Sequence, residues 1–176
     1  MVYSMEIYID GSCRNIGTPR AIGSAAAIFT NKDERSDKWT RDLRRGPRYP
    51  PPTNQRAELT SVILAIELAL IRFQKQETSP YLDVKIHSNS EYAMDCMTHG
   101  IHEWNGNGWI NDAGDEVENR DLMEKVLDLD YRLRDKGDVK YILIPKEENQ
   151  EADRFCNMAL DAQYEEVGPG NDEPVA

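Results

Sequence analysis

Residues 53–73 read TNQRAELTSVILAIELALIRF, and in this stretch the chain changes from strand patterning to helix patterning. Apolar residues recur at helical spacing from Asn54 to Phe73. They are Ala57, Val62, Leu64, Ala65, Leu68 and Ile71. Thr53 or Asn54 is suited to cap the start of the helix. We therefore predict one long helix after a loop at 46–52, which holds four of the nine prolines.

The residues before this loop have strand patterning. An apolar run from Met5 to Asp10 stops at Gly11, residues 21–30 are small and apolar, and residues 36–44 can form a third strand. Polar, turn-forming residues separate these runs at 13–20 and 31–35. The first third of the chain therefore predicts an antiparallel meander.

Strands and helices alternate after the long helix. We predict strands at 82–87 and 139–144, and helices at 90–99, 119–135 and 147–164. A loop rich in Gly, Asn and Trp separates the second helix from the third. This order predicts a mixed α/β sheet with helices on its faces.

Length and charge limit the class of protein. The 176 residues suit one domain, which we place at 1–163, and residues 164–176 form an acidic tail that we expect to be disordered. No apolar run approaches the roughly 18 residues of a membrane span. The N-terminus lacks a secretion signal, and three cysteines without a C-x-x-C pair favour an intracellular location, nuclear or cytoplasmic. The net charge of −11 argues against a nucleic-acid binder that relies on bulk positive charge, but allows an enzyme with an acidic, metal-filled site.

Acidic or polar residues stand at the ends of several predicted elements. Asp10 ends the first strand, Glu58 lies in the first turn of the long helix, and Asp153 lies near the start of the last helix. Asn89 follows the fourth strand. Each position alone is a weak signal, since most of the 32 acids are surface charges. Gathered together, the acids would be costly without cations, and oxygen ligands without His or Cys favour Mg²⁺ or Mn²⁺. Two such ions are suited to phosphodiester hydrolysis.

The sequence resembles type 1 ribonuclease H from about Met5 to Ala162. The matching motifs, in order, are IDGSC at 9–13, TNQRAEL at 53–59, SNSEY at 88–92, Trp104 with GW at 108–109, VENRDL at 117–122 and NQEAD at 149–153. The resemblance implies a ribonuclease H-like fold, α/β, with a five-stranded mixed sheet of three antiparallel strands followed by two parallel ones. It also implies a monomer that hydrolyses the RNA strand of RNA/DNA hybrids with two Mg²⁺ ions, for which Mn²⁺ can substitute.

The resemblance also assigns site residues. The catalytic and metal-binding positions are Asp10, Glu58, Asn89 and Asp153, and the substrate-binding positions are Asn15, Thr53, Asn54, Gln55, Asn119 and Trp109. Thr53 and Asn119 match residues that hold a DNA-strand phosphate. Asn54 and Gln55 match residues that reach the minor groove and the ribose 2′-hydroxyls, which distinguish RNA from DNA.

The sequence departs from the family pattern in four places. In the turn after Asp10, either Asn15 or Ile16 stands where the family has an Asn that contacts the RNA strand. Asn89 stands where the family has an aspartate, and an amide oxygen lacks the charge of a carboxylate. The segment 144–149 is too short for the His-bearing loop of many members. The handle segment at 105–116 has no Lys or Arg, which predicts weak substrate binding. Four arginines lie before and in the proline loop: Arg41, Arg44, Arg45 and Arg48. They either contact the backbone of the hybrid in place of the handle or are solvated residues at the end of a strand.

Two readings of function remain open from the sequence. The first is an endoribonuclease, either active or weakened or inactivated at Asn89 by a natural or a deliberate change. The alternative is a catalytically degenerate module that binds a hybrid or duplex, or a protein partner. The retained acids and substrate-contact residues favour the first reading, whereas Asn89 and the handle favour the alternative.

Overall fold

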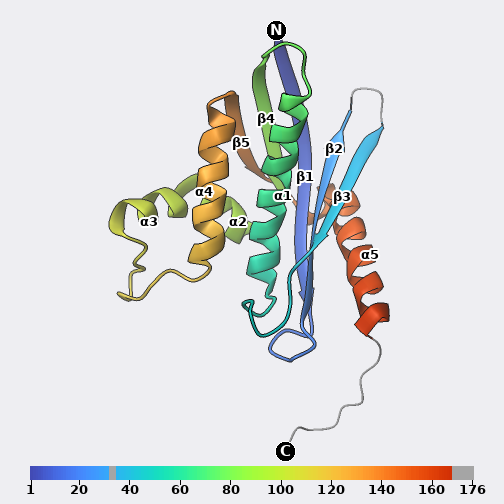
Figure 1. The fold of residues 1–176 in the computed structure, drawn as a ribbon, viewed down its shortest axis with the longest axis vertical. Coiled ribbons are helices and arrows are strands. Elements are labelled where there is room, and N and C mark those ends of the chain that lie inside the picture. The colour runs from blue at the N-terminus through green and yellow to red at the C-terminus, as the bar shows by residue number, and fades with distance from the viewer. Residues whose placement is uncertain (32–34, 168–176) are drawn as a thin grey trace, which may run out of the picture.

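The computed structural model describes residues 1–31 and 35–167, and its centre is a five-stranded sheet in the order β3-β2-β1-β4-β5 (Figure 1). The strands are β1 (Val2–Arg14), β2 (Ile22–Thr30), β3 (Ser36–Asp42), β4 (Tyr81–Ser88) and β5 (Gly137–Leu143). The α-helices are α1 (Asn54–Gln74), α2 (Glu91–Asp95), α3 (Ile101–Asn107), α4 (Arg120–Arg134) and α5 (Gln150–Val167). A π-helical turn, η1 (Cys96–Gly100), joins α2 to α3, and a 3-10 turn, η2 (Lys146–Glu148), precedes α5.

The strand pairing confirms the predicted fold class. β1 pairs antiparallel with β2, and β2 pairs antiparallel with β3. β4 runs parallel to both β1 and β5. The sheet therefore has three antiparallel strands followed by two parallel ones, as the resemblance implied.

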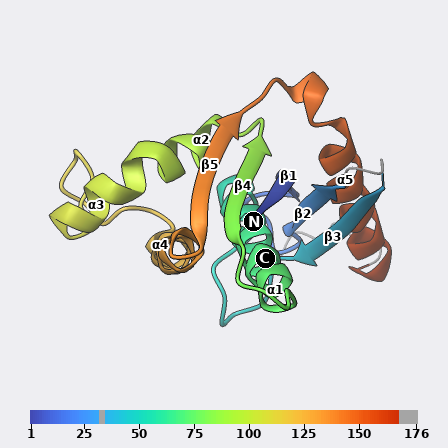
Figure 2. The same cartoon turned by 90° about the horizontal axis from the view of Figure 1, so that it is seen from above.

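Helices cover the two faces of the sheet unequally. α1 and α4 lie on one face, and α5 lies on the other, over β1, β2 and β3 (Figure 2). β2 lies between α1 and α5, so every residue of it except Thr30 is buried. Its small residues Ala25, Ala26 and Ala27 are fully buried, which lets both helices approach the sheet closely.

A close contact between β1 and α1 sets the position of the start of α1. A Cβ atom on Gly11 would lie 2.2 Å from the carbonyl oxygen of Ala57. Only glycine is compatible with this approach, because no real Cβ comes so near a backbone atom. The contact brings the N-terminal part of α1, including Glu58, against the strand that carries Asp10.

Several predicted boundaries were wrong. β1 does not stop at Gly11 but pairs with β2 as far as Arg14. The second helix does not end near His99, because the π turn η1 and α3 continue the helical segment to Asn107. Ile101, the first residue of α3, is buried in the core. The third strand ends at Asp42, before the expected Arg44.

The C-terminal segment lies partly inside the described residues. α5 continues past Tyr164 to Val167, so the first residues of the predicted tail are helical. The remainder of that tail, 168–176, lies outside the described residues. Among the helices described, none combines the length and the apolar character needed to cross a bilayer.

Candidate active site

Asp10 and Asn89 lie beside each other because β1 and β4 are parallel neighbours. The register pairs Tyr8 with His87, and β4 ends one residue later, at Ser88. Two residues beyond that pair, β1 carries Asp10 and the chain leaving β4 carries Asn89. In open α/β sheets, ligands bind outside the carboxyl ends of such strands.

Asn149 connects three elements at this point. It is 2% exposed, and its Nδ2 donates to the carbonyl oxygen of Ile9 at 2.8 Å and to Oδ1 of Asn89 at 2.7 Å. A carbonyl oxygen can only accept, so these contacts set the orientation of both amides. Asn89 therefore offers its oxygen to Asn149, and its other terminal atom is the nitrogen. Asn149 also stands directly before α5, so it ties the start of that helix to the ends of β1 and β4.

The carboxyl group of Asp10 is crowded by other acids. Burial and the neighbouring Asp153 raise its pKa to about 7, and Glu58 adds to this shift. A hydrogen bond from the backbone N–H of Gly11 opposes the shift only in part. The direct interaction with the Asp153 side chain contributes to this rise because two neighbouring carboxyl groups repel each other when both are ionised. The first turn of α5 thus brings Asp153 to the strand that carries Asp10.

Glu58 approaches from just beyond the first turn of α1, which itself carries no acid, so the predicted first-turn placement was wrong by a residue. Burial raises the pKa of Glu58, and a hydrogen bond to Ser90 offsets part of that rise. Ser90 also caps α2, because its side chain accepts from the backbone N–H of Ala93 at 3.1 Å. Glu58 is therefore joined to the residue that follows Asn89.

The donor set fits a hard divalent cation. All four predicted ligands offer oxygen, and the raised pKa of Asp10 shows that the acids lack a compensating positive charge. As the side chains stand in residues 1–31 and 35–167, no three His, Cys, Asp or Glu groups gather closely enough to hold a metal ion. The structure thus unites Asp10 with Asp153, and places Glu58 and Asn89 beside this pair without closing a ligand shell.

Cys156 lies near these acids but is unsuited to nucleophilic chemistry. Burial and the charges of Asp10 and Asp153 raise the pKa of its thiol to about 12. The thiol instead donates to the carbonyl oxygen of Ser24 at 3.2 Å. A thiol that stays protonated at neutral pH is not a nucleophile.

The predicted contact residues of α1 line its first turn. Thr53 is the N-cap, and its hydroxyl accepts from the backbone N–H of Arg56 at 3.1 Å. Oδ1 of Asn54 accepts from the backbone N–H of Cys13 at 2.9 Å, which joins α1 to the end of β1. Gln55 is exposed. Asn15 is also exposed, in the turn after β1, and has a left-handed backbone with φ 57°.

Asn119 forms a cluster with Arg56 that the sequence analysis missed. Nη1 of Arg56 donates to Oδ1 of Asn119 at 3.2 Å, and Nδ2 of Asn119 donates to the hydroxyl of Tyr92 at 3.2 Å. Arg56 also makes a bidentate ion pair with Asp121, at 2.9 Å and 2.7 Å. The signal was present, because Arg56 and Asp121 both fall inside the quoted motifs, but no spacing rule joins positions 65 residues apart.

Trp109 is a packing residue in this structure. Its side chain is 5% exposed and belongs to the core, and its backbone N–H donates to the carbonyl oxygen of Trp104 at 2.7 Å. This burial does not favour the direct substrate contact that the resemblance assigned. Trp109 follows α3, which projects from the body of the molecule (Figure 2).

Comparisons with known proteins give one family. A model of the family described as RNase H matches residues 3–161 of this chain. A ribonuclease H of Erythrobacter litoralis (strain HTCC2594) is 29% identical over 164 residues, covering 90% of this chain and 97% of that protein. A ribonuclease HI of Xylella fastidiosa (strain 9a5c) is 32% identical over 123 residues, covering 70% and 69%. A solved structure of the foamy viral protease-reverse transcriptase with an RNA/DNA hybrid has TM-score 0.65 and 18% identity, covering 92% of this chain and 20% of that one. The last likeness concerns the fold alone.

Proposed function

This chain belongs to the ribonuclease H family, and we propose that it is an endoribonuclease that hydrolyses the RNA strand of RNA/DNA hybrids. Water attacks phosphorus, the bond from phosphorus to the 3′-oxygen breaks, and the products carry a 3′-hydroxyl and a 5′-phosphate. The observation that carries the proposal is the meeting of Asp10 and Asp153 beside Glu58 and Asn89, which come from β1, α5, α1 and the segment after β4.

These residues are the proposed metal ligands. Asp10, Glu58 and Asp153 would hold two Mg²⁺ ions, or Mn²⁺ in their place, with Asn89 as the fourth position. Bound divalent cations supply an activated water and stabilise the leaving oxygen. Asp10, whose pKa is raised to about 7, must be deprotonated to act as a ligand.

The hybrid would lie across the first turn of α1 and the start of α4. Thr53 and Asn119 would contact a phosphate of the uncut strand, while Asn54, Gln55 and Asn15 would contact the minor groove and the RNA strand. A foamy viral relative in fold has been solved with an RNA/DNA hybrid, which supports this class of ligand. We further propose a monomer in a reducing, intracellular compartment, with residues 1–163 as the catalytic domain. The three free, buried cysteines suit such a compartment.

Asn89 is the weak position of the proposed site. Its Oδ1 already accepts a hydrogen bond from Asn149, so only one lone pair of an uncharged oxygen is left for a cation. An aspartate there could keep the bond from Asn149 with one oxygen and offer the other to a cation. This geometry also favours a second candidate function, a module that binds the hybrid without cutting it.

A cleavage assay separates the two functions. The substrate is a hybrid with a labelled RNA strand, at low salt with Mg²⁺ or Mn²⁺, and the proteins are this chain and Asn89→Asp. We expect Asn89→Asp to cleave at least about tenfold faster, which is about 1.4 kcal/mol in the barrier. Asp10→Asn in the Asn89→Asp background is the matched control and is expected to abolish cleavage.

Two outcomes would change the conclusion. If neither protein cuts but both bind the hybrid, the non-cutting module is the function. If neither cuts nor binds, the chain is an interaction domain that kept the fold alone.

A further inference from the structure

We propose that the hollow between α1, α4 and the segment after β3 binds the sugar–phosphate backbone of the uncut strand, beyond the phosphate contacted by Thr53 and Asn119. The inference rests on the proposed function and adds to it a second backbone-binding site. We name the hollow the α1–α4 hollow; its basic lining residues are Arg41, Arg44, Arg56 and Lys125.

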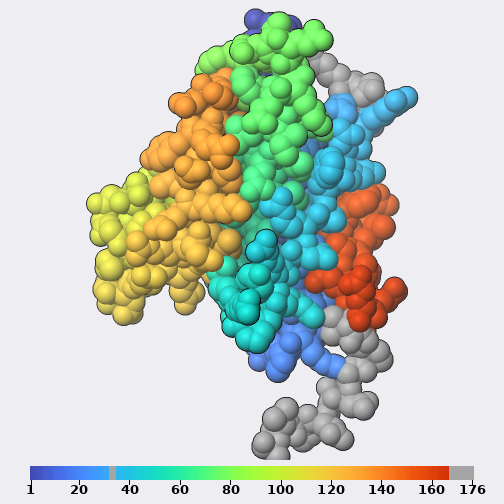
Figure 3. Space-filling view, viewed as in Figure 1, coloured from blue at the N-terminus to red at the C-terminus, as the bar shows by residue number. Residues whose placement is uncertain are grey.

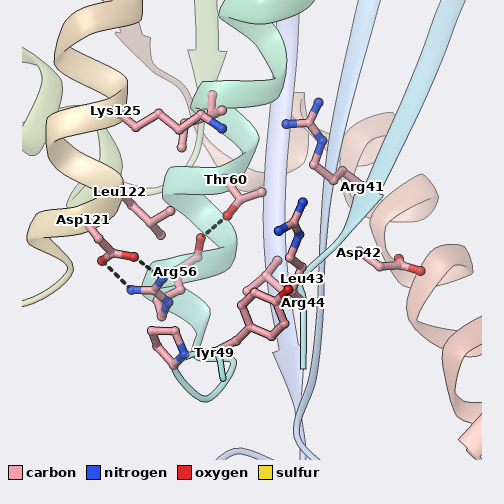
Figure 4. A pocket seen from close by; sticks show the side chains of 12 residues that line it. Arg41, Asp42, Leu43, Arg44, Tyr49, Arg56, Thr60, Asp121, Leu122 and Lys125 are labelled. Atoms are coloured by element: carbon pink, nitrogen blue, oxygen red, sulfur yellow. Dashed lines mark hydrogen bonds and ion pairs between the residues drawn. The ribbon is translucent and has the colours of Figure 1, made fainter. Parts of the chain in front are cut away.

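The hollow has the size and place of a surface site. Its volume is about 530 Å³, Tyr49 of the proline loop lies at its lower end (Figure 4), and Pro50 also lines it. α4, α1 and the segment after β3 meet side by side on this face of the molecule (Figure 3). Residues from three separate parts of the chain therefore form it.

Positive charge exceeds negative charge inside the hollow. Arg41 and Lys125 both pair with one carboxylate, Glu67, at 2.8 Å and 3.4 Å. Asp121 pairs with Arg56. Asp42 lines the rim but its side chain turns toward α5 and away from these cations, and the Ser24 hydroxyl of β2 donates to it at 3.2 Å (Figure 4). Because the whole chain has a net charge of −11, this local excess of cations distinguishes the hollow from the average surface of the protein.

Arg44 is the cation best placed to meet a phosphate. Its guanidinium lies over the Tyr49 ring, with 5.5 Å between the guanidinium carbon and the ring centroid. No carboxylate pairs with it in the part of the chain that the structure describes. An arginine stacked on an aromatic ring is held in place while its donors stay open, and this arrangement suits a phosphate.

The hollow is continuous with the proposed strand contacts. Arg56 lines it and also donates to Asn119 at 3.2 Å, while its backbone N–H donates to the Thr53 hydroxyl at 3.1 Å. A strand held by Thr53 and Asn119 therefore passes directly to Arg56 and the hollow. The handle segment at 105–116 has no Lys or Arg, so the cations of the hollow would supply the backbone contacts that it lacks.

The experiment measures hybrid binding by fluorescence anisotropy across a salt series in Mg²⁺. The proteins are this chain, Arg44→Glu, Arg44→Lys and a charge-matched control, Lys140→Glu. Lys140 is exposed on β5 and faces away from the buried side of that strand. We expect Arg44→Glu to weaken binding about tenfold at low salt and to reduce the salt slope by about one. Arg44→Lys keeps the charge and should keep the slope, and Lys140→Glu should match the parent chain.

A shortened hybrid tests the site itself. Its uncut strand stops at the phosphate assigned to Thr53 and Asn119, so the effect of Arg44→Glu should vanish with it. If the long hybrid binds the parent chain and Arg44→Glu equally, with equal salt slopes, the hollow is not a backbone site and the proposed function stands. If the parent chain does not bind the long hybrid at low salt, the proposed function and this inference both fail.

Discussion

At the scale of single residues, Asn149 links the site to the scaffold. Its amide nitrogen reaches the Ile9 carbonyl, directly before Asp10, and the side chain of Asn89. Its own Oδ1 is buried without a partner among the described residues. A buried acceptor without a donor is costly, so this residue is retained at some expense in stability. Its contacts hold the first strand, the fourth strand and the last helix in one arrangement.

The raised pKa of Asp10 predicts a pH-dependent stability without metal. The pKa is about 7 in the folded protein, against an ordinary value of 3.8. The folded state therefore holds the proton more tightly, so its stability falls as pH rises from about 4 through about 7. The steepest loss is about 1.4 kcal/mol per pH unit. In EDTA, Asp10→Asn should raise the free energy of unfolding by about 1–3 kcal/mol at pH 8, and much less at pH 5.

Urea unfolding at the two pH values measures this difference. Asp112→Asn serves as the control. It also removes one negative charge, but Asp112 lies in the exposed loop after α3 and is not part of the site. If Asp10→Asn raises the free energy of unfolding equally at pH 5 and pH 8, ionisation of Asp10 among the other acids does not destabilise the folded protein.

At the scale of elements, the junction of β1 with α1 organises the site. Gly11 allows the close approach, Asn54 bonds to the backbone of Cys13, and Thr53 caps the helix. All of these contacts act on the turn that carries Glu58. The position of that carboxylate therefore depends on how the helix begins.

The cap predicts a stability effect that can be separated from substrate binding. Thr53→Ala removes the acceptor for the Arg56 N–H and should lower the free energy of unfolding by about 1 kcal/mol. Thr53→Ser keeps the hydroxyl and should cost only a few tenths of that amount. Chemical denaturation of both variants gives the comparison, and equal losses would mean that the hydroxyl does not act as a cap.

At the scale of the whole molecule, the net charge of −11 governs how the protein responds to ions. Monovalent salt screens the general repulsion, whereas divalent cations should act mainly on the acids of the site. These two responses can be distinguished, because only the second depends on particular carboxylates.

Thermal unfolding gives that distinction. A cation that binds only the folded state stabilises it, so Mg²⁺ at about ten times its Kd should add about 1.4 kcal/mol. For a protein of this size the gain corresponds to about 3–6 °C in Tm. NaCl of equal ionic strength should give a smaller shift, and Glu58→Gln should remove most of the Mg²⁺-specific part. If Mg²⁺ and NaCl act alike in the parent chain, the acids do not form a cation site.

Local pattern determined much of this protein before its tertiary structure was known. Strand alternation and helical spacing predicted the order of elements, and the motifs around Asp10, Glu58, Asn89 and Asp153 predicted the family and the candidate ligands. Such patterns predict helices and strands because the burial of one face of an element imposes a period on its apolar residues. The ends of elements were less predictable: β1 runs on to Arg14 because β2 pairs with it there, and α3 extends the second helix because Ile101 is buried.

Only the tertiary structure decided which distant residues meet. It joined Asn149 to Asn89 across 60 positions and Arg56 to Asp121 across 65, and it brought Arg44 and Lys125 to one hollow. It also placed Trp109 in the core, although the family resemblance had assigned it as a substrate contact. The physical reason is that side-chain orientation, hydrogen bonding and charge repulsion act through space, whereas periodicity and motif spacing report only on neighbours along the chain.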